Sequence, residues 1–500
     1  MKYYETLEDC GMNNYADIGL AIDLAADAGN LPKLNELVCT IDALLGQEGQ
    51  NKAVLFYFRA NAYSALRTTD PEFQERQFDW EQPELTKEII SLREAIRSSE
   101  FADLDIVRRC QVLTNLGNAL DAVGRPIDAL AAWDEALQIE PKFAMALANR
   151  ASGLSGYSAA FYDPGHQCVF LAEAAKGFEF ALATDAIWDS EYPDSVREQL
   201  EAKYQHVRAY LAVNCDLAGF DPDKYELGDT SDARAFNCWR LQHRLFLNPL
   251  NDIGAHSIAA QDVFHLPNHT YGLDEPVIFP RYFDLLKQEY VAACTLLFEG
   301  LEGERVYAAD QTLLGFEHAD YAINTVQTEK QKAAFRMAYS LLDKCAVFIN
   351  DYFKLGHDPH SLSTSFRNVW YCGRGAKRVL HPNLPIKNWH LRGLCSLSLD
   401  LYENDFRETA SPLAHQACDV RNAAEHRFVS VHEMLLHTDD IGACLALSAS
   451  DLESQALRML RLARSAIIGL SLVVQHQEKH LKEKASDLVM PIFAIPKDPR

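Results

Sequence analysis

The residues best suited to chemistry lie at 421–426, where the sequence is Arg-Asn-Ala-Ala-Glu-His. The guanidinium of Arg421 can hold a phosphate by a two-pronged contact. The imidazole of His426 can take a proton from one oxygen and return one to another. A base for a 2′-hydroxyl nucleophile and a cation for the charged transition state are the minimum parts for cutting RNA without a metal. We therefore predict that Arg421, Asn422 and His426 are catalytic, with Asn422 orienting a partner group, and that no metal or other cofactor takes part.

A helix is expected to position this motif. An apolar stripe at spacings of three and four residues predicts its core face: Leu413, Ala417, Val420, Ala424, Phe428, Val431 and Leu435. At about 100° per residue, Arg421 lies roughly 60° from the centre of this stripe, and His426 lies on the far side. Because residues five apart diverge by about 140°, one chain is poorly placed to grip a phosphate with both groups. A two-fold homodimer across the far face would bring two copies of the motif together.

Charge is distributed unevenly along the 500 residues, whose net charge is −24. Residues 1–280 contain 22 Lys and Arg against 44 Asp and Glu, whereas residues 281–500 contain 25 against 27. The net charges are therefore −22 and −2. The N-terminal part should repel nucleic acid, so a site for a polyanion belongs in the C-terminal part.

One window of the C-terminal part contains no acidic residue, namely the residues between Asp358 and Asp400. Its cations and aromatic residues alternate: Arg367, Arg374, Lys377, Arg378, Lys387 and Arg392 with Phe366, Trp370, Tyr371 and Trp389. Cations beside aromatic faces suit a single-stranded backbone and its bases. We predict RNA binding by Arg367, Arg374, Lys377, Arg378 and Arg427. A solvated loop whose cations pair with the protein's own acidic part is the open alternative.

The N-terminal part has the pattern of helix pairs. Residues 110–143 carry Leu113, Leu116, Gly117, Leu120, Ala129, Trp133, Ala136 and Pro141 at the positions of a tetratricopeptide (TPR) repeat, which they resemble. Further pairs are expected at 14–46, at 56–95 with an inserted loop, and at 147–184. Such repeats stack into a surface for a protein or peptide partner, or into a scaffold, and the residues do not separate these two roles.

The rest of the chain predicts a connector and a helical bundle. Residues 215–280 are rich in Asp, Asn, Pro and Gly, with one helix near 234–245. The histidines and carboxylates of this connector have no defensible ligand spacing, so structural roles are favoured over a metal site. Helical patterns then occupy 281–301, 326–355, 385–406, 411–437 and 448–485. We therefore predict an all-α protein with TPR-like repeats at 1–214, a connector at 215–280 and a bundle at 281–500.

The C-terminal part resembles a known superfamily. Arg421-Asn422-x-x-x-His426 resembles the arginine–polar–spacer–histidine motif of the HEPN superfamily, and residues 334–344, 348–350 and 391–394 are similar to a bacterial HEPN family fused behind TPR-like repeats. The resemblance implies a dimeric, metal-independent RNA endonuclease that leaves a 2′,3′-cyclic phosphate, in a toxin or anti-phage setting. A non-catalytic TPR/HEPN module that binds protein or RNA is the alternative.

Three further features limit other functions. His432 and His437 lie five residues apart, so the His-Glu-x-x-His requirement of zinc proteases fails. Arg458, Arg461 and Arg464 form a stripe that is expected to be solvated or paired with the acidic repeats rather than to contact RNA. The twelve cysteines are scattered singly and the longest apolar run is far too short to span a bilayer, so we expect unpaired cysteines, no membrane association and a cytoplasmic protein.

Overall fold

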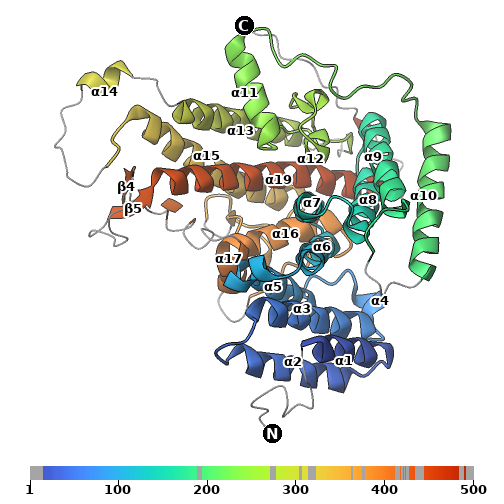
Figure 1. Cartoon of the computed structure of the whole chain (residues 1–500). Helices are drawn as coiled ribbons and strands as arrows, with labels where there is room; N and C mark the ends of the chain where they lie inside the picture. Colours follow the sequence, from blue (N-terminus) through green and yellow to red (C-terminus); the bar gives the residue numbers. More distant parts are fainter. Residues whose placement is uncertain are drawn as a thin grey trace. The chain divides into compact units, whose positions relative to one another are not determined.

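The computed structural model describes residues 15–188, 194–270, 277–302, 307–312, 322–361, 364–373, 378–410, 417, 420, 421, 423, 427–433, 444–482, 489 and 490. The chain divides into two compact units, Met1–Leu217 and Ala218–Arg500. Helices dominate both units (Figure 1), and the few strands are two to five residues long. The predicted all-α class is confirmed.

The N-terminal unit is built from helix pairs. Its elements are α1 (Tyr15–Asp27), α2 (Leu31–Leu45), α3 (Lys52–Thr69), α4 (Phe73–Arg76), α5 (Pro83–Arg97), the 3-10 helix η2 (Ser99–Asp103), α6 (Ile106–Ala122), α7 (Pro126–Ile139), α8 (Ala144–Ser158), α9 (Pro164–Leu182) and α10 (Asp194–Asn214). The expected pairs correspond to α1 with α2, α3 with α5, α6 with α7, and α8 with α9. Gly29 at the first turn and Gly124 at the third have positive φ angles of 64° and 95°, a conformation that glycine adopts without strain.

Trp133 shows how closely these helices approach. Its side chain is 2% exposed, and a Cβ atom added to Gly117 would lie 2.4 Å from its Nε1 atom. A Cβ atom at Gly153, on the next pair, would lie 2.3 Å from its ring. The indole Nε1 donates to the carbonyl of Thr114 at 3.2 Å, so its polar atom is satisfied inside the core. Gly117 and Gly153 therefore leave the space that the indole of Trp133 occupies.

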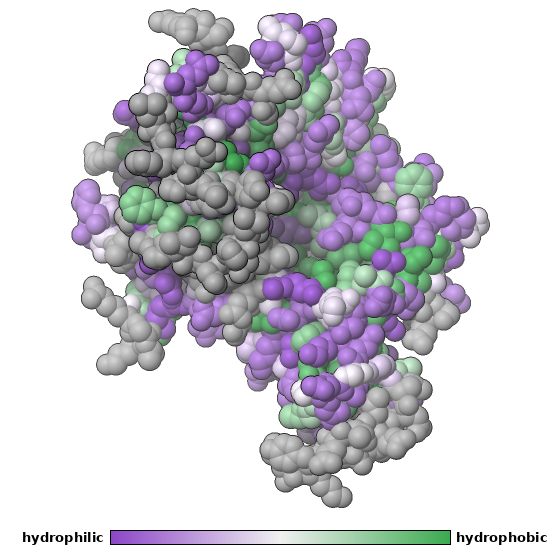
Figure 2. Space-filling view, turned by 60° about the vertical axis from the view of Figure 1, so that its left-hand side comes forward, coloured by the Kyte–Doolittle hydropathy of each residue, from purple (hydrophilic) through white to green (hydrophobic). Residues whose placement is uncertain are grey.

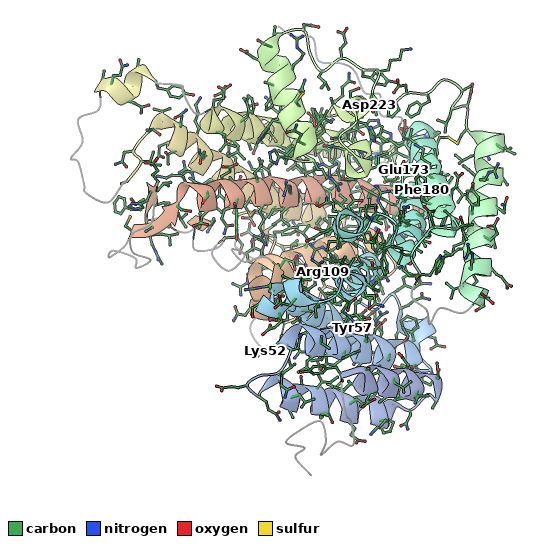
Figure 3. The ribbon with its side chains drawn as sticks, viewed as in Figure 1. Lys52, Tyr57, Arg109, Glu173, Phe180 and Asp223 are labelled. Atoms are coloured by element: carbon green, nitrogen blue, oxygen red, sulfur yellow. A yellow bond between two sulfur atoms is a disulfide. The ribbon has the colours of Figure 1, made fainter. Side chains whose placement is uncertain are left out.

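Polar contacts and one disulfide join the later helices of this unit. Arg150 on α8 donates to Asp134 on α7 at 2.6 Å and to Glu173 on α9 at 3.3 Å; Figure 3 labels Glu173 on α9. Cys168 on α9 and Cys215, just after α10, form a disulfide. The expectation that all the cysteines are unpaired is wrong for these two, because folding brings together residues 47 positions apart.

The C-terminal unit contains the bundle. Its elements are α11 (Ser231–Gln242), α12 (Leu250–Ile253), the 3-10 helix η3 (Ser257–Ala259), β1 (His269–Thr270), α13 (Phe279–Leu301), α14 (Ala308–Thr312), α15 (Val326–Tyr352), β2 (Tyr371–Cys372), β3 (Val379–Leu380), α16 (Trp389–Tyr402), α17 (Asn404–Ala410), β4 (Phe428–His432), β5 (Cys444–Ser448), α19 (Ala449–Lys482) and β6 (Val489–Met490). The long helices α13, α15 and α19 pack on one another (Figure 1), and α16 packs on α19. Pro280 lies in the first turn of α13, where a missing N–H has no cost.

Buried polar contacts attach residues 240–266 to the bundle. Arg464 on α19 is 2% exposed, and its guanidinium contacts Asp252 at 2.5 Å and donates to the carbonyl of Asn248 at 2.9 Å. On α13, Tyr290 donates to the carbonyl of Leu245 at 2.8 Å. These residues therefore belong to the C-terminal compact unit, and Arg464 is a structural anchor rather than part of a solvated stripe.

The helix expected at 411–437 is interrupted. Residues 428–432 form β4, which pairs in parallel with β5, placing Phe428 opposite Cys444. The amide of Ile323 also donates to the carbonyl of Val431, on the same strand, at 2.7 Å. Phe428 is 72% exposed, so its assignment to the core stripe is wrong. In the sequence Phe-Val-Ser-Val-His, the β-branched residues Val429 and Val431 alternate with the others, which suits a strand once partner segments are available.

The described surface is mainly polar. On the face that Figure 2 shows, hydrophilic residues predominate among the described ones and hydrophobic residues gather in smaller patches. Within the described part of the chain, no helix has the length and apolar character needed to cross a membrane.

Candidate functional site

Arg421 lies in a helical stretch that packs on α15. Ala417 and Val420 are helical and at most 1% exposed, as predicted for these two members of the stripe. Ala423, which was not assigned to the stripe, is helical and 1% exposed as well. Arg421 is half-buried beside them. Its guanidinium carbon lies 5.6 Å from the ring centroid of Tyr339 on α15, within range of a cation–π interaction. The predicted motif arginine is therefore fixed against an aromatic face.

One face of α15 connects the motif to neighbouring segments. Lys332, Arg336, Tyr339 and Asp343 are spaced by four, three and four residues, which places them along one side of the helix. Lys332 donates to the carbonyl of Val429 on β4 at 2.9 Å. Asp343 accepts from the amide of Phe366 in the basic window at 2.9 Å. The same helix face thus holds β4, Arg421 and the start of the basic window.

Two predicted RNA-binding cations are linked to Arg421 through intervening side chains, Arg367 by two aromatic rings and Arg378 by a neighbour of the second ring. The ring of Tyr402, at the end of α16, lies 6.4 Å from the ring of Tyr339, edge to face. Tyr402 also contacts Arg367, whose guanidinium carbon lies 5.9 Å from the centroid of the Tyr402 ring. Arg378 forms a salt bridge at 3.0 Å with Glu403, the residue after Tyr402. We call Arg367, Arg378, Arg421, Tyr339 and Tyr402 the arginine–tyrosine cluster.

Other members of the basic window have different roles. Phe366 and Trp370 are fully buried and pack edge to face, and Arg392 is 5% exposed. None of the three is available to stack on a base, which corrects the expectation of an alternating cation–aromatic surface. Tyr371 is covered by Arg378, 3.9 Å from its ring. The core thus takes up two aromatic side chains and one cation of the window, whereas Arg367 and Lys387 are exposed.

Several predicted residues lie outside the described part of the chain: Asn422, His426, Arg374 and Lys377. Arg427 is described and exposed, immediately before β4, and its amide donates to the carbonyl of Ala423 at 2.9 Å. A second arginine–histidine pair with the same spacing begins at Arg427 and ends at His432, which is 8% exposed on β4. Its two residues lie on different secondary structures, so it does not form a helical motif.

The histidines and carboxylates of residues 215–280 have structural partners. The ring of His256 contacts Asp223 at 3.0 Å, and His269 is buried beside the carbonyl of Pro267 at 2.7 Å. Among the residues that the structure describes, no group of three or more His, Cys, Asp or Glu could hold a metal ion. The structural interpretation of these residues fits their contacts.

A comparison with protein families identifies the C-terminal part of the chain. The model of the family described as LA2681-like HEPN matches residues 270–477. The C-terminal unit contains a HEPN domain. The match includes α13, α15, α16 and the motif arginine, together with all five members of the arginine–tyrosine cluster. No curated protein and no solved structure matches the chain significantly. The family match does not include the N-terminal unit, whose TPR-like character stays a prediction.

The HEPN domain contains functional candidates that the sequence reasoning did not select. Tyr339 and Tyr402 organise the cluster, and Glu403 balances Arg378. Tyr339 belongs to the segment that resembled the family, but a tyrosine on a helix is more often part of a core. The contact between the rings of Tyr339 and Tyr402 is visible only in the tertiary structure, because the two residues are far apart in sequence.

Burial keeps two potentially reactive side chains near the cluster, Cys395 and Tyr371, in their protonated forms. The pKa of the Cys395 thiol on α16 is raised to about 12 by burial. Burial also raises the pKa of the Tyr371 phenol above its ordinary value. Neither group supplies an anionic nucleophile near neutral pH. The described chemistry of this region is therefore cationic and suits phosphate binding.

Proposed function

We propose that this protein is a metal-independent RNA endonuclease whose active site includes Arg421 and His426. The observation that carries the proposal is that, inside a HEPN domain, the rings of Tyr339 and Tyr402 link Arg421 to Arg367, and Glu403, the residue after Tyr402, pairs with Arg378. Three cations gathered by contacts from four segments are suited to one phosphate backbone. Arg421 would stabilise the charge on the scissile phosphate, and His426 would transfer protons between the ribose and the leaving oxygen.

The cluster also supports an order of contacts along RNA. Arg421 is half-buried on Tyr339, whereas Arg367 is exposed. Arg378 is intermediate and paired with a half-exposed Glu403. A buried cation suits the reacting phosphate, and exposed cations suit the flanking backbone, where each contact adds salt-dependent affinity. Arg374, Lys377 and Arg427 remain candidates for the same backbone contacts, and Asn422 for orienting the scissile phosphate.

RNA cleavage in EDTA tests the proposal. Purified protein should cut RNA into fragments with a 2′,3′-cyclic phosphate and a 5′-hydroxyl. Arg421→Ala and His426→Ala should each lower the rate by about a hundredfold or more, because a lost transition-state donor costs that much. Arg367→Ala should weaken RNA binding at low salt, whereas Lys387→Ala, an exposed cation of the same window outside the cluster, should leave it unchanged.

A binding-only HEPN domain is the second candidate. Its supporting observation is that Arg421 packs on Tyr339, a contact that would also suit a structural arginine. Intact RNA under every condition, with Arg367→Ala still weakening RNA binding, would favour this alternative. RNA that is neither cut nor bound would remove both.

The assembly and the cellular setting are further parts of the proposal. A homodimer would place two motifs together, and sedimentation of the purified chain at twice its mass of 56.2 kDa would support it. A cytoplasmic toxin or anti-phage effector fits the proposed activity. Growth arrest on expression of the wild-type chain in bacteria, but not of Arg421→Ala, would support that setting. The N-terminal unit would then regulate cleavage by binding a protein partner.

A further inference from the structure

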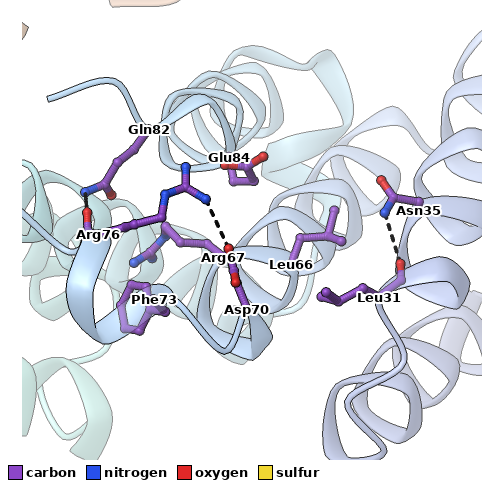
Figure 4. A pocket seen from close by; sticks show the side chains of 9 residues that line it. All are labelled: Leu31, Asn35, Leu66, Arg67, Asp70, Phe73, Arg76, Gln82 and Glu84. Carbon is purple, nitrogen blue, oxygen red and sulfur yellow. Dashed lines mark hydrogen bonds and ion pairs between the residues drawn. The ribbon is translucent and has the colours of Figure 1, made fainter. Parts of the chain in front are cut away.

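The first helices of the N-terminal unit are braced by side-chain contacts around a cavity of about 210 Å³ (Figure 4). The charges in its lining balance, since they are two arginines and two carboxylates: Arg67, Arg76, Asp70 and Glu84. Arg67 on α3 pairs with Glu88 on α5 at 2.9 Å, and Arg76 on α4 pairs with Asp70 at 3.1 Å. Polar contacts between several helices therefore hold this end of the unit together.

The last helix of the unit, α10, is attached much more lightly. Its buried residues are Leu200 and Val207, and the other side chains of the helix are exposed or partly exposed. The helix packs on α9, and Lys203 donates to the hydroxyl of Ser152 on α8 at 3.4 Å, at the exposed surface. Because most helix stability in a protein comes from packing of an apolar face, two buried side chains are a weak attachment for a helix of 21 residues.

A disulfide reinforces the end of α10 from which the chain continues. Cys168, near the start of α9, is bonded to Cys215, the residue after α10. At the opposite end, Arg197 of α10 donates to the carbonyl of Leu182, the last residue of α9, at 2.8 Å, so the two helices run antiparallel. The C-terminal unit begins at Ala218, three residues after Cys215. The disulfide therefore fixes the point on α9 at which the chain leaves the N-terminal unit.

Without the disulfide, the chain would still be held to the N-terminal unit at Ile187. The amide of Ile187 donates to the carbonyl of Lys142 at 2.8 Å, and its carbonyl accepts from the amide of Ala144 at 3.0 Å. We call residues 188–217 the tether. If α10 came off α9, the tether could span up to about 100 Å, compared with about 10 Å for the three residues after Cys215.

Both cysteines of the pair are half-buried, so a small thiol or disulfide can reach the bond between Cys168 and Cys215. Accessible disulfides are the ones that exchange readily with thiols. Other cysteines of the chain are shielded, and burial raises the pKa of each of these thiols to about 11 or 12: Cys110, Cys294, Cys345 and Cys395. The pair at the end of α10 is therefore better placed for exchange than these four.

We propose that the Cys168–Cys215 disulfide is a reversible redox switch that sets the length of the tether between the N-terminal unit and the HEPN domain. The co-reactant is a small disulfide such as glutathione disulfide. One thiolate of the pair attacks a sulfur of the reagent and releases one glutathione thiol, and the second thiolate then attacks the mixed disulfide and releases the other. The pair loses two electrons and two protons, and the reagent gains both. The switch does not depend on the nuclease proposal, because none of its residues belongs to the HEPN domain.

Opening of the bond should favour release of α10. Its two cysteines are 47 residues apart. A cross-link over a loop of this length restricts the open chain by an amount that corresponds to up to about a thousandfold in the equilibrium constant for release. Since the remaining attachment of α10 is weak, a protease should detect the released helix in the reduced protein.

Thiol trapping and limited proteolysis of the full chain test this inference. Protein would be equilibrated with glutathione buffers from fully reduced to fully oxidised, quenched in acid and alkylated, and mass spectrometry would give the fraction of chains that contain the bond. Trypsin would then be added to the reduced and the oxidised protein. It can cut α10 after Arg197, Lys203 and Arg208, and Lys33 on α2 provides an internal reference.

We expect the bond to form and open within this range of buffers, and we expect α10 to be cut at least about tenfold faster in the reduced protein, because cleavage follows the population of the open form. Cleavage after Lys33 should not change. Cys168→Ser should be cut at the fast rate in both buffers. Cys39→Ser, which removes an exposed free thiol of the same unit, is the matched control and should respond to the buffer as the wild type does.

A bond that stays open, or stays closed, at every glutathione ratio would overturn the proposal. Equal cleavage of α10 in the reduced and the oxidised protein would overturn it as well. Faster cleavage after Lys33 in the reduced protein would indicate unfolding of the whole unit instead of release of α10, and would also refute the switch. The wild-type chain in the two buffers decides the outcome even where Cys168→Ser does not fold.

Discussion

Arg464→Met is the most informative change in the C-terminal unit, because it tests whether residues 243–266 are held to the HEPN helices by a buried cation. Arg464 on α19 is 2% exposed, and its partner Asp252 is 1% exposed. The guanidinium also donates to the carbonyls of Phe246 at 2.5 Å and Asn248 at 2.9 Å. Methionine would keep most of the volume and remove all of these donors.

The expected cost follows from this burial. Removing one partner of a buried ion pair typically costs about 3–5 kcal/mol, because the other charge is left uncompensated. An exposed pair typically contributes about 0–1 kcal/mol. Arg461, one turn earlier on α19, is exposed and donates to the carbonyl of His243 at 3.1 Å. Arg461→Met is therefore the matched control and should cost less than about 1 kcal/mol.

Hydrogen exchange read by mass spectrometry is the suitable assay, because two compact units make a single global unfolding energy poorly defined. Arg464→Met should accelerate exchange in residues 240–266 and in α19 by several hundredfold, and Arg461→Met should have little effect. The double variant Arg464→Met with Asp252→Asn should recover part of the loss, since no buried charge then remains unpaired. Equal exchange in Arg464→Met and Arg461→Met would refute the assigned burial of this ion pair.

Two other predictions concern the disulfide and acid stability. Reduction with dithiothreitol, or Cys168→Ser, should destabilise the attachment of α10 by up to about 4 kcal/mol for a loop of this length. The buried residues of α10 are Leu200 and Val207. Hydrogen exchange should become faster in α10 and stay unchanged in α2, and unchanged protection of α10 would contradict the disulfide. Burial, with smaller contributions from the charges of His476 and Lys479, lowers the pKa of His390 to about 3. The unfolded chain therefore binds this proton at a higher pH, near 6.5, and stability should fall by about 1.4 kcal/mol per pH unit as the pH decreases from 6.5 toward 3. Urea unfolding of the C-terminal unit at pH 7 and pH 5 should show a smaller loss in His390→Gln, and an equal loss would remove this explanation.

The sequence predicted most of the helices because their signals are local. The stripe of α15, the proline at the start of α13 and the Gly117–Trp133 spacing each depend on residues within one or two helices. The same kind of signal misassigned residues 428–432 as helix, because Phe428 and Val431 fit the helical spacing of three, whereas in the strand they point to opposite faces and only Val431 is buried. Pairing with β5 and Ile323, segments that are distant in sequence, decided in favour of the strand.

For the candidate site too, some features were visible in the sequence and others depended on the tertiary structure. The motif 421–426 and the acid-free window were visible from the sequence, because residue type and spacing carry the chemistry of an arginine, a histidine and a cluster of cations. The tertiary structure alone decided which cations meet. The rings of Tyr339 on α15 and Tyr402 on α16 meet edge to face, which links Arg367 to Arg421, and Arg378 pairs with Glu403, the residue after Tyr402. Arg392 is buried instead, since its helix α16 packs against α19. Side-chain burial depends on which helix faces meet, and that is a property of the whole domain rather than of any one segment.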